Sequence, residues 1–112
     1  MSDALSIAAS GLGAAAAALN ITAQNLANLN TAGYQTRQAN FTAQAGGGVS
    51  VSSVENDGGS DNAQGNNVDL ATQMVSLGQE KILYDANAAV IRVDQQMFGS
   101  LLDIFDNASN RG

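Results

Sequence analysis

The sequence contains no cysteine, histidine, proline or tryptophan, and aromatic residues make up only 4% of its 112 positions. Without cysteine or histidine there is no thiolate nucleophile, no imidazole base and no soft-ligand site for zinc. These absences exclude redox, zinc and catalytic-triad chemistry, so we expect no enzyme, no cofactor and no metal. The missing cysteines fit either a cytosolic protein or an exported one without disulfides.

Charge is also scarce, because only 12% of the residues are charged and ten acids outnumber four cations, for a net charge of −6. The cations Arg37, Lys81, Arg92 and Arg111 are scattered along the chain. A surface that follows a phosphate backbone needs clustered cations instead. We therefore expect no nucleic-acid partner.

Alanine is the commonest residue, with 20 copies. A core of alanine buries little apolar area, which is worth about 25 cal/mol per Å², while ordering the backbone costs roughly 1–2 kcal/mol per residue. We therefore expect the chain to complete its burial against neighbours, either its own copies or other subunits.

No charge occurs between Asp3 and Arg37, which raises the question of a membrane span. The apolar stretch from Ala4 to Leu19 is interrupted by serine and glycine and is shorter than the roughly 20 residues that a spanning helix needs. The opening Met-Ser-Asp also lacks the cationic start of a secretory signal. The sequence predicts no membrane span and no cleaved signal peptide.

Apolar residues recur every seven positions in two long segments, one at each end of the chain. In the first segment they are Leu5, Leu12, Leu19 and Leu26, with a second row at Ala8, Ala15, Thr22 and Leu29. In the second segment they are Leu70, Leu77, Tyr84, Ile91, Phe98 and Phe105, with a second row at Leu83, Val90, Met97 and Ile104.

A seven-residue repeat is the spacing of a left-handed coiled-coil seam. We predict helices over 3–30 and 68–106, paired as an antiparallel hairpin in which the two seams face each other. At 1.5 Å per residue the second helix is about 58 Å long and the first about 42 Å. Part of the second helix should therefore overhang and need another subunit to cover it.

Local signals support these limits. Ser2 or Asp3 can cap the first helix, and Asn66 or Asn67 with Asp69 can open the second. Gly33 is a plausible stop for the first helix. Gly11 and Gly13 each cost the first helix about 1 kcal/mol relative to alanine, but they allow another helix backbone to approach closely.

The middle of the chain reads differently. Apolar and polar residues alternate weakly over 34–54, which predicts a small β-hairpin or extended arm. The stretch 55–67 is polar and rich in glycine and asparagine, which predicts a flexible loop. Its acids do not match the spacing of an EF-hand calcium loop. The fold class expected overall is mainly α, in one domain.

Amides gather near the end of the first helix, at Asn20, Gln24, Asn25, Asn28 and Asn30. Asparagine is a mediocre helix former, so these residues are not there for helix propensity. Amides can donate and accept hydrogen bonds across an interface without a charge to desolvate. They serve either such an interface or simply a polar helix end.

Two segments carry a resemblance to a known family. The segment AASGL at 8–12, followed by AQNLANLNTAGY at 23–34, resembles the N-terminal signature of the bacterial flagellar rod and hook family. The segments VDL at 68–70, YDANA at 84–88 and MFGSLL at 97–102 look like its C-terminal helix. Both ends match in the right order.

The resemblance implies a structural subunit whose terminal helices pack into the inner tube of an axial filament. It also implies export by the flagellar type III apparatus without a cleaved signal, and a place in the periplasmic rod of the basal body. The partners would be other rod subunits and copies of this chain. The short middle points to the small proximal-rod type. From the seams and the resemblance together, the expected packing residues are Leu5, Leu12, Leu19, Asn25, Leu26, Asn28, Asn30, Gly33, Tyr34, Leu70, Leu77, Tyr84, Asn87, Ile91, Phe98 and Leu102.

Two alternatives stay open. One is a secreted helical-hairpin protein that forms a small closed oligomer, although the Trp-x-Gly turn of that group is missing. The other is a divergent rod paralogue with another role, since Ala32 stands where the family usually has proline and the chain is short.

Overall fold

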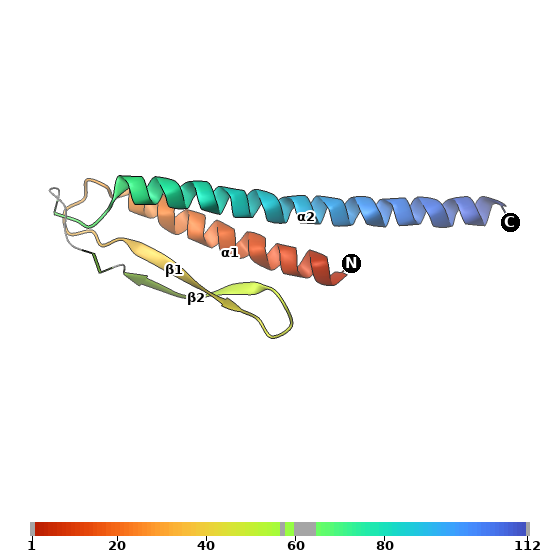
Figure 1. Cartoon of the computed structure of the whole chain (residues 1–112), viewed down its shortest axis with the longest axis horizontal. Coiled ribbons are helices and arrows are strands. Elements are labelled where there is room, and N and C mark those ends of the chain that lie inside the picture. The colour runs from red at the N-terminus through yellow and green to blue at the C-terminus, as the bar shows by residue number, and fades with distance from the viewer. Residues whose placement is uncertain (1, 57, 60–64, 112) are drawn as a thin grey trace.

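The computed structural model describes residues 2–56, 58–59 and 65–111. The elements follow in the order α1 (Ser2–Ala27), β1 (Arg37–Ala43), β2 (Val49–Asn56) and α2 (Leu70–Arg111). The chain forms a narrow rod with extents of 75 × 26 × 15 Å (Figure 1). The prediction of a mainly α fold with two long helices and a short hairpin is confirmed.

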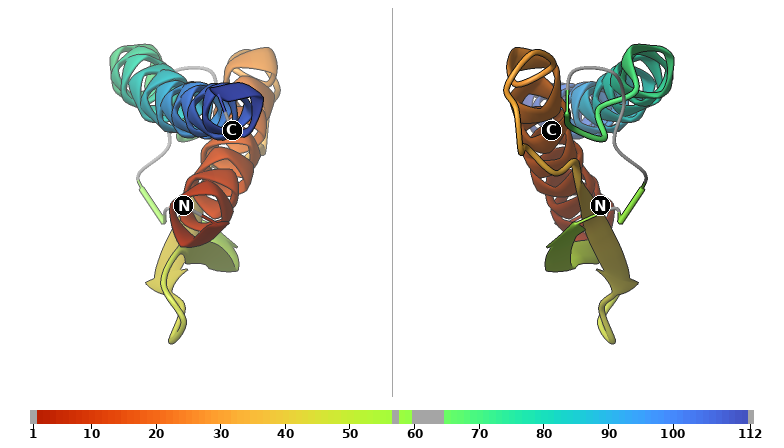
Figure 2. Two further views of the ribbon diagram at one scale, coloured as in Figure 1. Left: turned by 90° about the vertical axis from the view of Figure 1, so that its right-hand side faces the viewer. Right: turned by 90° about the vertical axis from the view of Figure 1, so that its left-hand side faces the viewer.

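Helix α1 lies at the centre of the arrangement. Helix α2 runs antiparallel to it on one side, and the β1–β2 hairpin packs on another side, as the end-on views in Figure 2 show. Because Gly11 of α1 lies beside Asn87 of α2, the start of α1 lies beside about residue 96. The projecting segment, residues 97–111, therefore extends beyond α1 (Figure 1).

The helices begin and end at somewhat different residues from those predicted. Helix α1 stops at Ala27, not at residue 30, because the backbone N–H of Asn28 is shared between the carbonyls of Gln24 and Asn25 at 3.1 and 3.3 Å. Gly33 does not end the helix. It sits in the following loop at φ +79° and donates its N–H to the Gly65 carbonyl at 2.9 Å.

Asp69 caps α2 as predicted. Its Oδ1 accepts the backbone N–H of Ala71 at 3.0 Å, and its Oδ2 accepts the Thr72 hydroxyl at 3.1 Å. The helix then continues to Arg111 rather than ending at residue 106. At the N-terminus of α1, Asp3 lies in the first turn, where its negative charge interacts favourably with the helix dipole.

The predicted pairing of the two seams is confirmed for the second row of α1, at Ala8, Ala15 and Thr22, and is wrong for the leucine row and for the rows of α2. The buried stripe of α1 consists of small and polar residues, namely Ala8, Ala14, Ala15, Ala18, Thr22 and Asn25. The leucines of the predicted seam are only half-buried, and Leu5 is 37% exposed. On α2 the buried or half-buried residues opposite this stripe include Gln73, Glu80 and Asn87. The small residues face α2 because short side chains allow the two helix backbones to approach closely.

Gly11 marks the closest approach of the helices. A Cβ built there would lie 2.6–2.8 Å from the side-chain amide of Asn87. Gly13 has no such neighbour within 4 Å. The prediction of close packing therefore holds for Gly11 within this chain and not for Gly13.

The hairpin pairs Arg37 with Asn56 at one end and Ala43 with Val49 at the other, with a bulge opposite Asn40 and Phe41. Its turn is fixed to α1 by one serine. The Oγ of Ser10 accepts the Val49 N–H at 3.1 Å and donates to the Ile7 carbonyl at 2.7 Å.

The predicted flexible loop over 55–67 is wrong at both ends. Glu55 and Asn56 belong to β2. Asn66 is fully buried and donates a hydrogen bond to the turn that follows α1. Positions 57 and 60–64, the centre of that prediction, lie outside the described residues. An amide can hold a polar segment in place as firmly as apolar contacts can.

The segment Asp3–Ala27 is long and apolar enough, by length and composition, to cross a membrane. The same helix packs against α2 and the hairpin, and it buries Thr22 and Asn25 there. Buried helices of water-soluble assemblies pass the same test, so the segment carries no further conclusion.

Substituting the two helix glycines separates packing from helix propensity. Gly13→Ala should raise the free energy of unfolding by about 1 kcal/mol. Gly11→Ala should bring almost no net gain. Its new methyl group displaces the Asn87 amide from its 2.9 Å bond to the Leu83 carbonyl, and this loss of about 1 kcal/mol offsets the gain in helix propensity. In an Asn87→Ala background the two glycine substitutions should become equivalent. Urea unfolding followed by circular dichroism measures all of these, and equal gains in the wild-type background would contradict the packing role.

Candidate assembly interface

Asn25 connects three elements of the chain and is 1% exposed. Its Nδ2 donates to the Arg37 carbonyl and to Gln73 Oε1 of α2, both at 2.9 Å. Its Oδ1 accepts the Tyr34 hydroxyl at 2.8 Å and the Arg37 N–H at 3.0 Å. All four hydrogen-bonding positions of the amide are therefore used, and α1, the start of β1 and the start of α2 are held at one point.

Two further asparagines close this end of the rod. The Nδ2 of Asn66 donates to the carbonyls of Leu29 and Thr31 at 2.8 and 3.0 Å. The Oδ1 of Asn67 accepts the Thr36 N–H at 2.6 Å and its hydroxyl at 3.0 Å. These bonds satisfy backbone groups of the turn after α1, which would otherwise be buried without partners.

Tyr34 completes the Asn25 cluster. Burial raises the pKa of its hydroxyl above the ordinary value, and the nearby Arg37 charge opposes this effect. The phenol therefore stays protonated at neutral pH and serves as the donor to Asn25.

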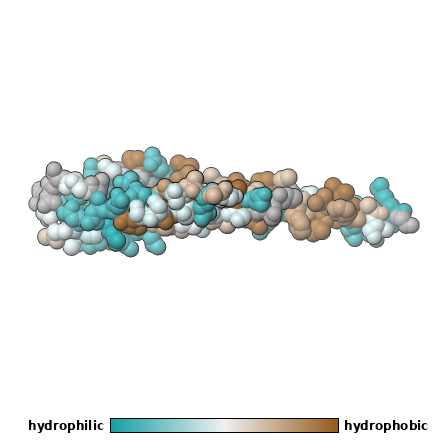
Figure 3. Space-filling model, turned by 90° about the horizontal axis from the view of Figure 1, so that it is seen from below, coloured by the Kyte–Doolittle hydropathy of each residue, from teal (hydrophilic) through white to brown (hydrophobic). Residues whose placement is uncertain are grey.

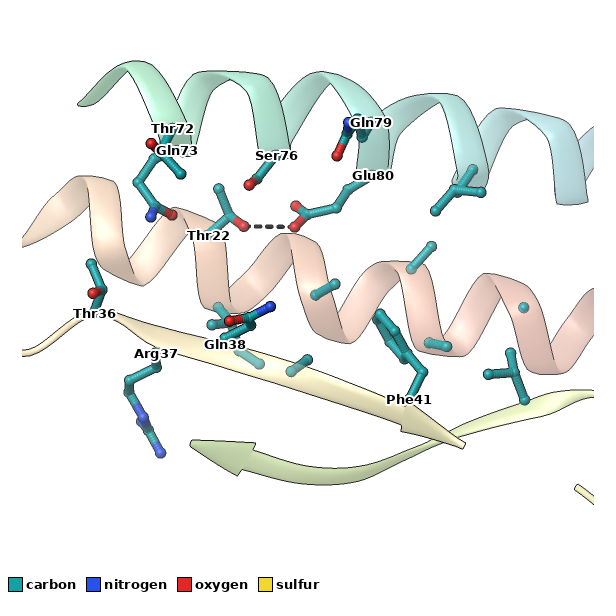
Figure 4. A pocket seen from close by; sticks show the side chains of 18 of the residues that line it. Thr22, Thr36, Arg37, Gln38, Phe41, Thr72, Gln73, Ser76, Gln79 and Glu80 are labelled. Atoms are coloured by element: carbon teal, nitrogen blue, oxygen red, sulfur yellow. Dashed lines mark hydrogen bonds between the residues drawn. The ribbon is translucent and has the colours of Figure 1, made fainter. Parts of the chain in front are cut away.

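A groove of about 450 Å³ runs along α1, bounded by α2 on one side and by the hairpin on the other (Figure 4). Its floor is made of the small α1 residues Gly11, Ala14, Ala15 and Ala18. Its α2 wall is polar, and its hairpin wall includes Phe41 and Val49. No group of three acids that could hold a metal ion occurs in the part of the chain that the structure describes.

Glu80 lies in the α2 wall of this groove. Its Oε1 accepts the Thr22 hydroxyl at 2.7 Å, whereas its Oε2 is buried without a hydrogen-bond partner (Figure 4). Burial raises the pKa of this carboxyl, and the bond from Thr22 lowers it by a smaller amount. The group is a polar side chain whose hydrogen bonding is left incomplete.

The apolar surface of α2 is largely uncovered. Leu83, Val90, Met97 and Ile104 are 45–65% exposed, and Phe98 and Phe105 are 54% and 65% exposed. Brown, apolar atoms gather on the visible face of the projecting segment (Figure 3). An exposed apolar surface of this extent marks a site of protein contact.

The expected packing residues divide into two groups. Asn25, Asn28, Tyr34 and Asn87 make hydrogen bonds within this chain. The large apolar ones are half-buried or exposed, namely Leu5, Leu12, Leu19, Leu26, Leu70, Leu77, Tyr84, Ile91, Phe98 and Leu102. Asn30 and Gly33 are exposed in the turn after α1. Of these amides the structure buries only Asn25, and it leaves most of the apolar rows accessible for other contacts.

Sequence reasoning placed Thr22 in the second row of the seam but missed the partners across the helix pair, Glu80 for Thr22 and Gln73 for Asn25. A signal for both partners exists, because Gln73, Glu80 and Asn87 recur every seven residues as a polar row on α2. Thr36 has no comparable signal, since several hydroxyl residues occur in the polar middle of the chain. Ser10 lies in the segment AASGL, but nothing in that segment indicates its bond to the hairpin.

The class of protein follows from comparison with known families. Residues 5–35 match the family described as flagella basal body rod protein. This span covers α1 and the turn that Asn25 and Asn66 organise. The match supports a structural protein of the flagellar axis rather than an enzyme family.

Individual relatives give a more particular similarity. Over 127 aligned positions the chain is 33% identical to flagellar hook-associated protein 1 of Salmonella typhimurium (strain LT2), covering 98% of this chain and 23% of that protein. The same values hold for flagellar hook-associated protein 1 of Salmonella typhi. The chain thus spans about a quarter of the length of these relatives. The findings together support a flagellar location and a structural role in the axial part of the flagellum.

Removing the Asn25 amide should destabilise the chain strongly. Asn25→Ala leaves the Tyr34 hydroxyl, the Arg37 N–H and Gln73 without their partner, at an expected loss of about 3 kcal/mol or more. Asn20→Ala is the matched control, because Asn20 is exposed on the same helix and should change stability by no more than about 0.5 kcal/mol. Chemical unfolding of the purified variants compares the two, and similar losses would remove Asn25 from its central role.

Glu80 should make stability depend on pH. Its pKa is raised in the folded chain above the ordinary 4.5. Its contribution to the free energy of unfolding is therefore fully present below pH 4.5 and is lost as the pH rises through the folded-state pKa. Glu80→Gln removes this titration, and a neutral amide costs less to bury than a carboxylate. The variant should therefore be more stable than the wild type at neutral pH, and the difference should shrink toward about pH 4. Melting temperatures across this range test the expectation, which parallel curves for the two proteins would contradict.

Proposed function

We propose that this chain is a structural subunit of the flagellar basal-body rod, polymerising by packing of its terminal helices after export by the flagellar type III apparatus. The observation that carries the proposal is the uncovered apolar surface of α2, which extends into the projecting segment. A subunit that places its apolar rows outside needs neighbours along its length. A contact that does not close on itself gives a filament.

The small core supports export in an unfolded form. In the described part of the chain the fully buried apolar residues are four alanines and Val68, so unfolding exposes little additional apolar area to water. The partners proposed are other rod subunits, copies of this chain and the export apparatus, and the place proposed is the periplasmic rod. The family match over α1 favours the rod, whereas the relatives' name favours a hook-associated position as the second candidate.

A deletion strain tests the proposed function. Loss of swimming, together with recovery of the tagged chain in purified basal bodies, is the expected result. Recovery only at the hook would favour the second candidate. Normal swimming with the chain soluble or in the medium would overturn both. A small closed oligomer would show a fixed size as concentration rises, whereas a filament-forming subunit grows.

Two substitutions in the projecting segment test the surface itself. Leu102→Glu places a charge among apolar contacts and should cost assembly about 3 kcal/mol or more, roughly a hundredfold in the association constant. Asp103→Lys is the control, because Asp103 is likewise exposed and its helix neighbours three and four positions away are Gly99, Ser100, Asp106 and Asn107, none of them a large apolar residue. Incorporation of each tagged variant into basal bodies is the measurement. Equal incorporation would show that this apolar surface is not an assembly contact.

A further inference from the structure

The incomplete hydrogen bonding of Glu80 is unusual for its position. A buried acceptor without a donor costs free energy, and this one belongs to a group that can carry a full charge. Its Oε2 has no partner although Thr22 serves its Oε1. Because Glu80 also lines the open groove and is only partly buried, a change in its side-chain torsions can present the carboxylate to a molecule in the groove.

Among the described residues no cation pairs with this carboxylate. Lys81 forms an ion pair with Asp85 at 2.7 Å on the exposed side of α2. Arg37 lines the groove from the hairpin side, and its side chain points away from Glu80 (Figure 4). No other cation lines the groove in the described part of the chain.

From these observations we propose that Glu80 is a recognition site for a lysine or arginine that a helix of a neighbouring axial subunit inserts into the groove. The inference rests on the proposed function, since it assumes an axial assembly. The small floor at Ala14, Ala15 and Ala18 leaves room for a few side chains of such a helix. Phe41 and Val49 provide apolar contact beside the charge.

Charge balance identifies the partner as a different subunit, one richer in basic residues than this chain. The chain has ten acids and only four cations. A charge-assisted bond to a carboxylate in a partly desolvated site discriminates strongly between partners. A second copy of this chain would bring a net charge of −6 to the contact and is the less complementary occupant.

The test uses the full chain in a strain that lacks its own copy. Glu80→Gln should lower the fraction of chain in purified basal bodies by roughly tenfold or more, while the isolated variant is more stable than the wild type at neutral pH. A variant that is more stable but less incorporated has lost recognition and not folding. Asp94→Asn removes the same charge from the same heptad row of α2 outside the groove and should incorporate normally.

A charge-reversal screen then identifies the partner. Glu80→Arg should abolish incorporation, and suppressors should exchange a lysine or arginine for an acid in another axial subunit. Normal incorporation of Glu80→Gln would overturn the proposal, and so would a variant that is both less stable and less incorporated. Suppressors at Arg92 or Arg111 of this chain would overturn the choice of a different subunit and identify a second copy of this chain as the partner. A wild-type chain absent from basal bodies would instead overturn the proposed function.

Discussion

The four hydrogen bonds of Asn25 are the constraint on which the rest of the structure depends. They join α1, the start of β1 and the start of α2, so the hairpin and the second helix are both placed relative to α1 at that position. Only an amide of this length offers two donors and two acceptors without a charge. An aspartate would lose both donors, and an alanine would leave four partner groups on three residues unsatisfied. The neighbouring amides of Asn66 and Asn67 then complete the same end of the rod.

The distribution of polarity in this chain is the reverse of that in an ordinary monomer. Its helix pair is joined by small and polar residues such as Ala15, Thr22 and Glu80, while the large apolar rows of α2 point outward. Hydrogen bonds contribute only about 1 kcal/mol each to stability, so an interior of this kind fixes geometry more than it adds free energy. The larger apolar gain becomes available only when another molecule covers α2. Shape is determined within the chain, and the larger apolar contribution would arise in the assembly that we propose.

Much of the architecture was predictable from the sequence because it depends on local rules. The seven-residue repeats gave both helices, the alternation before and after the glycine turn gave the hairpin, and Asp69 was recognisable as a cap. The choice of facing rows was not predictable in the same way. The leucine row and the row at Ala15 and Thr22 both look like the seam of a pair, and nothing local says that the second row will be the buried one. Asn66 was mistaken for part of a flexible loop because its partners lie on the far side of the turn after α1.

The difference between the two ends of the rod has a physical consequence for assembly. At the end held by Asn25, polar groups satisfy one another within a single chain, so this part needs no partner to reach its geometry. In the projecting segment every described side chain up to Arg111 is exposed except Gly99, which has none beyond its backbone. This segment continues α2, so the cost of starting a helix is already met in the part that packs against α1. Its apolar residues nevertheless gain free energy only when another surface covers them. The end held by Asn25 can therefore reach its geometry within a single chain, whereas the apolar surface of the projecting segment would leave water only in the assembly that we propose.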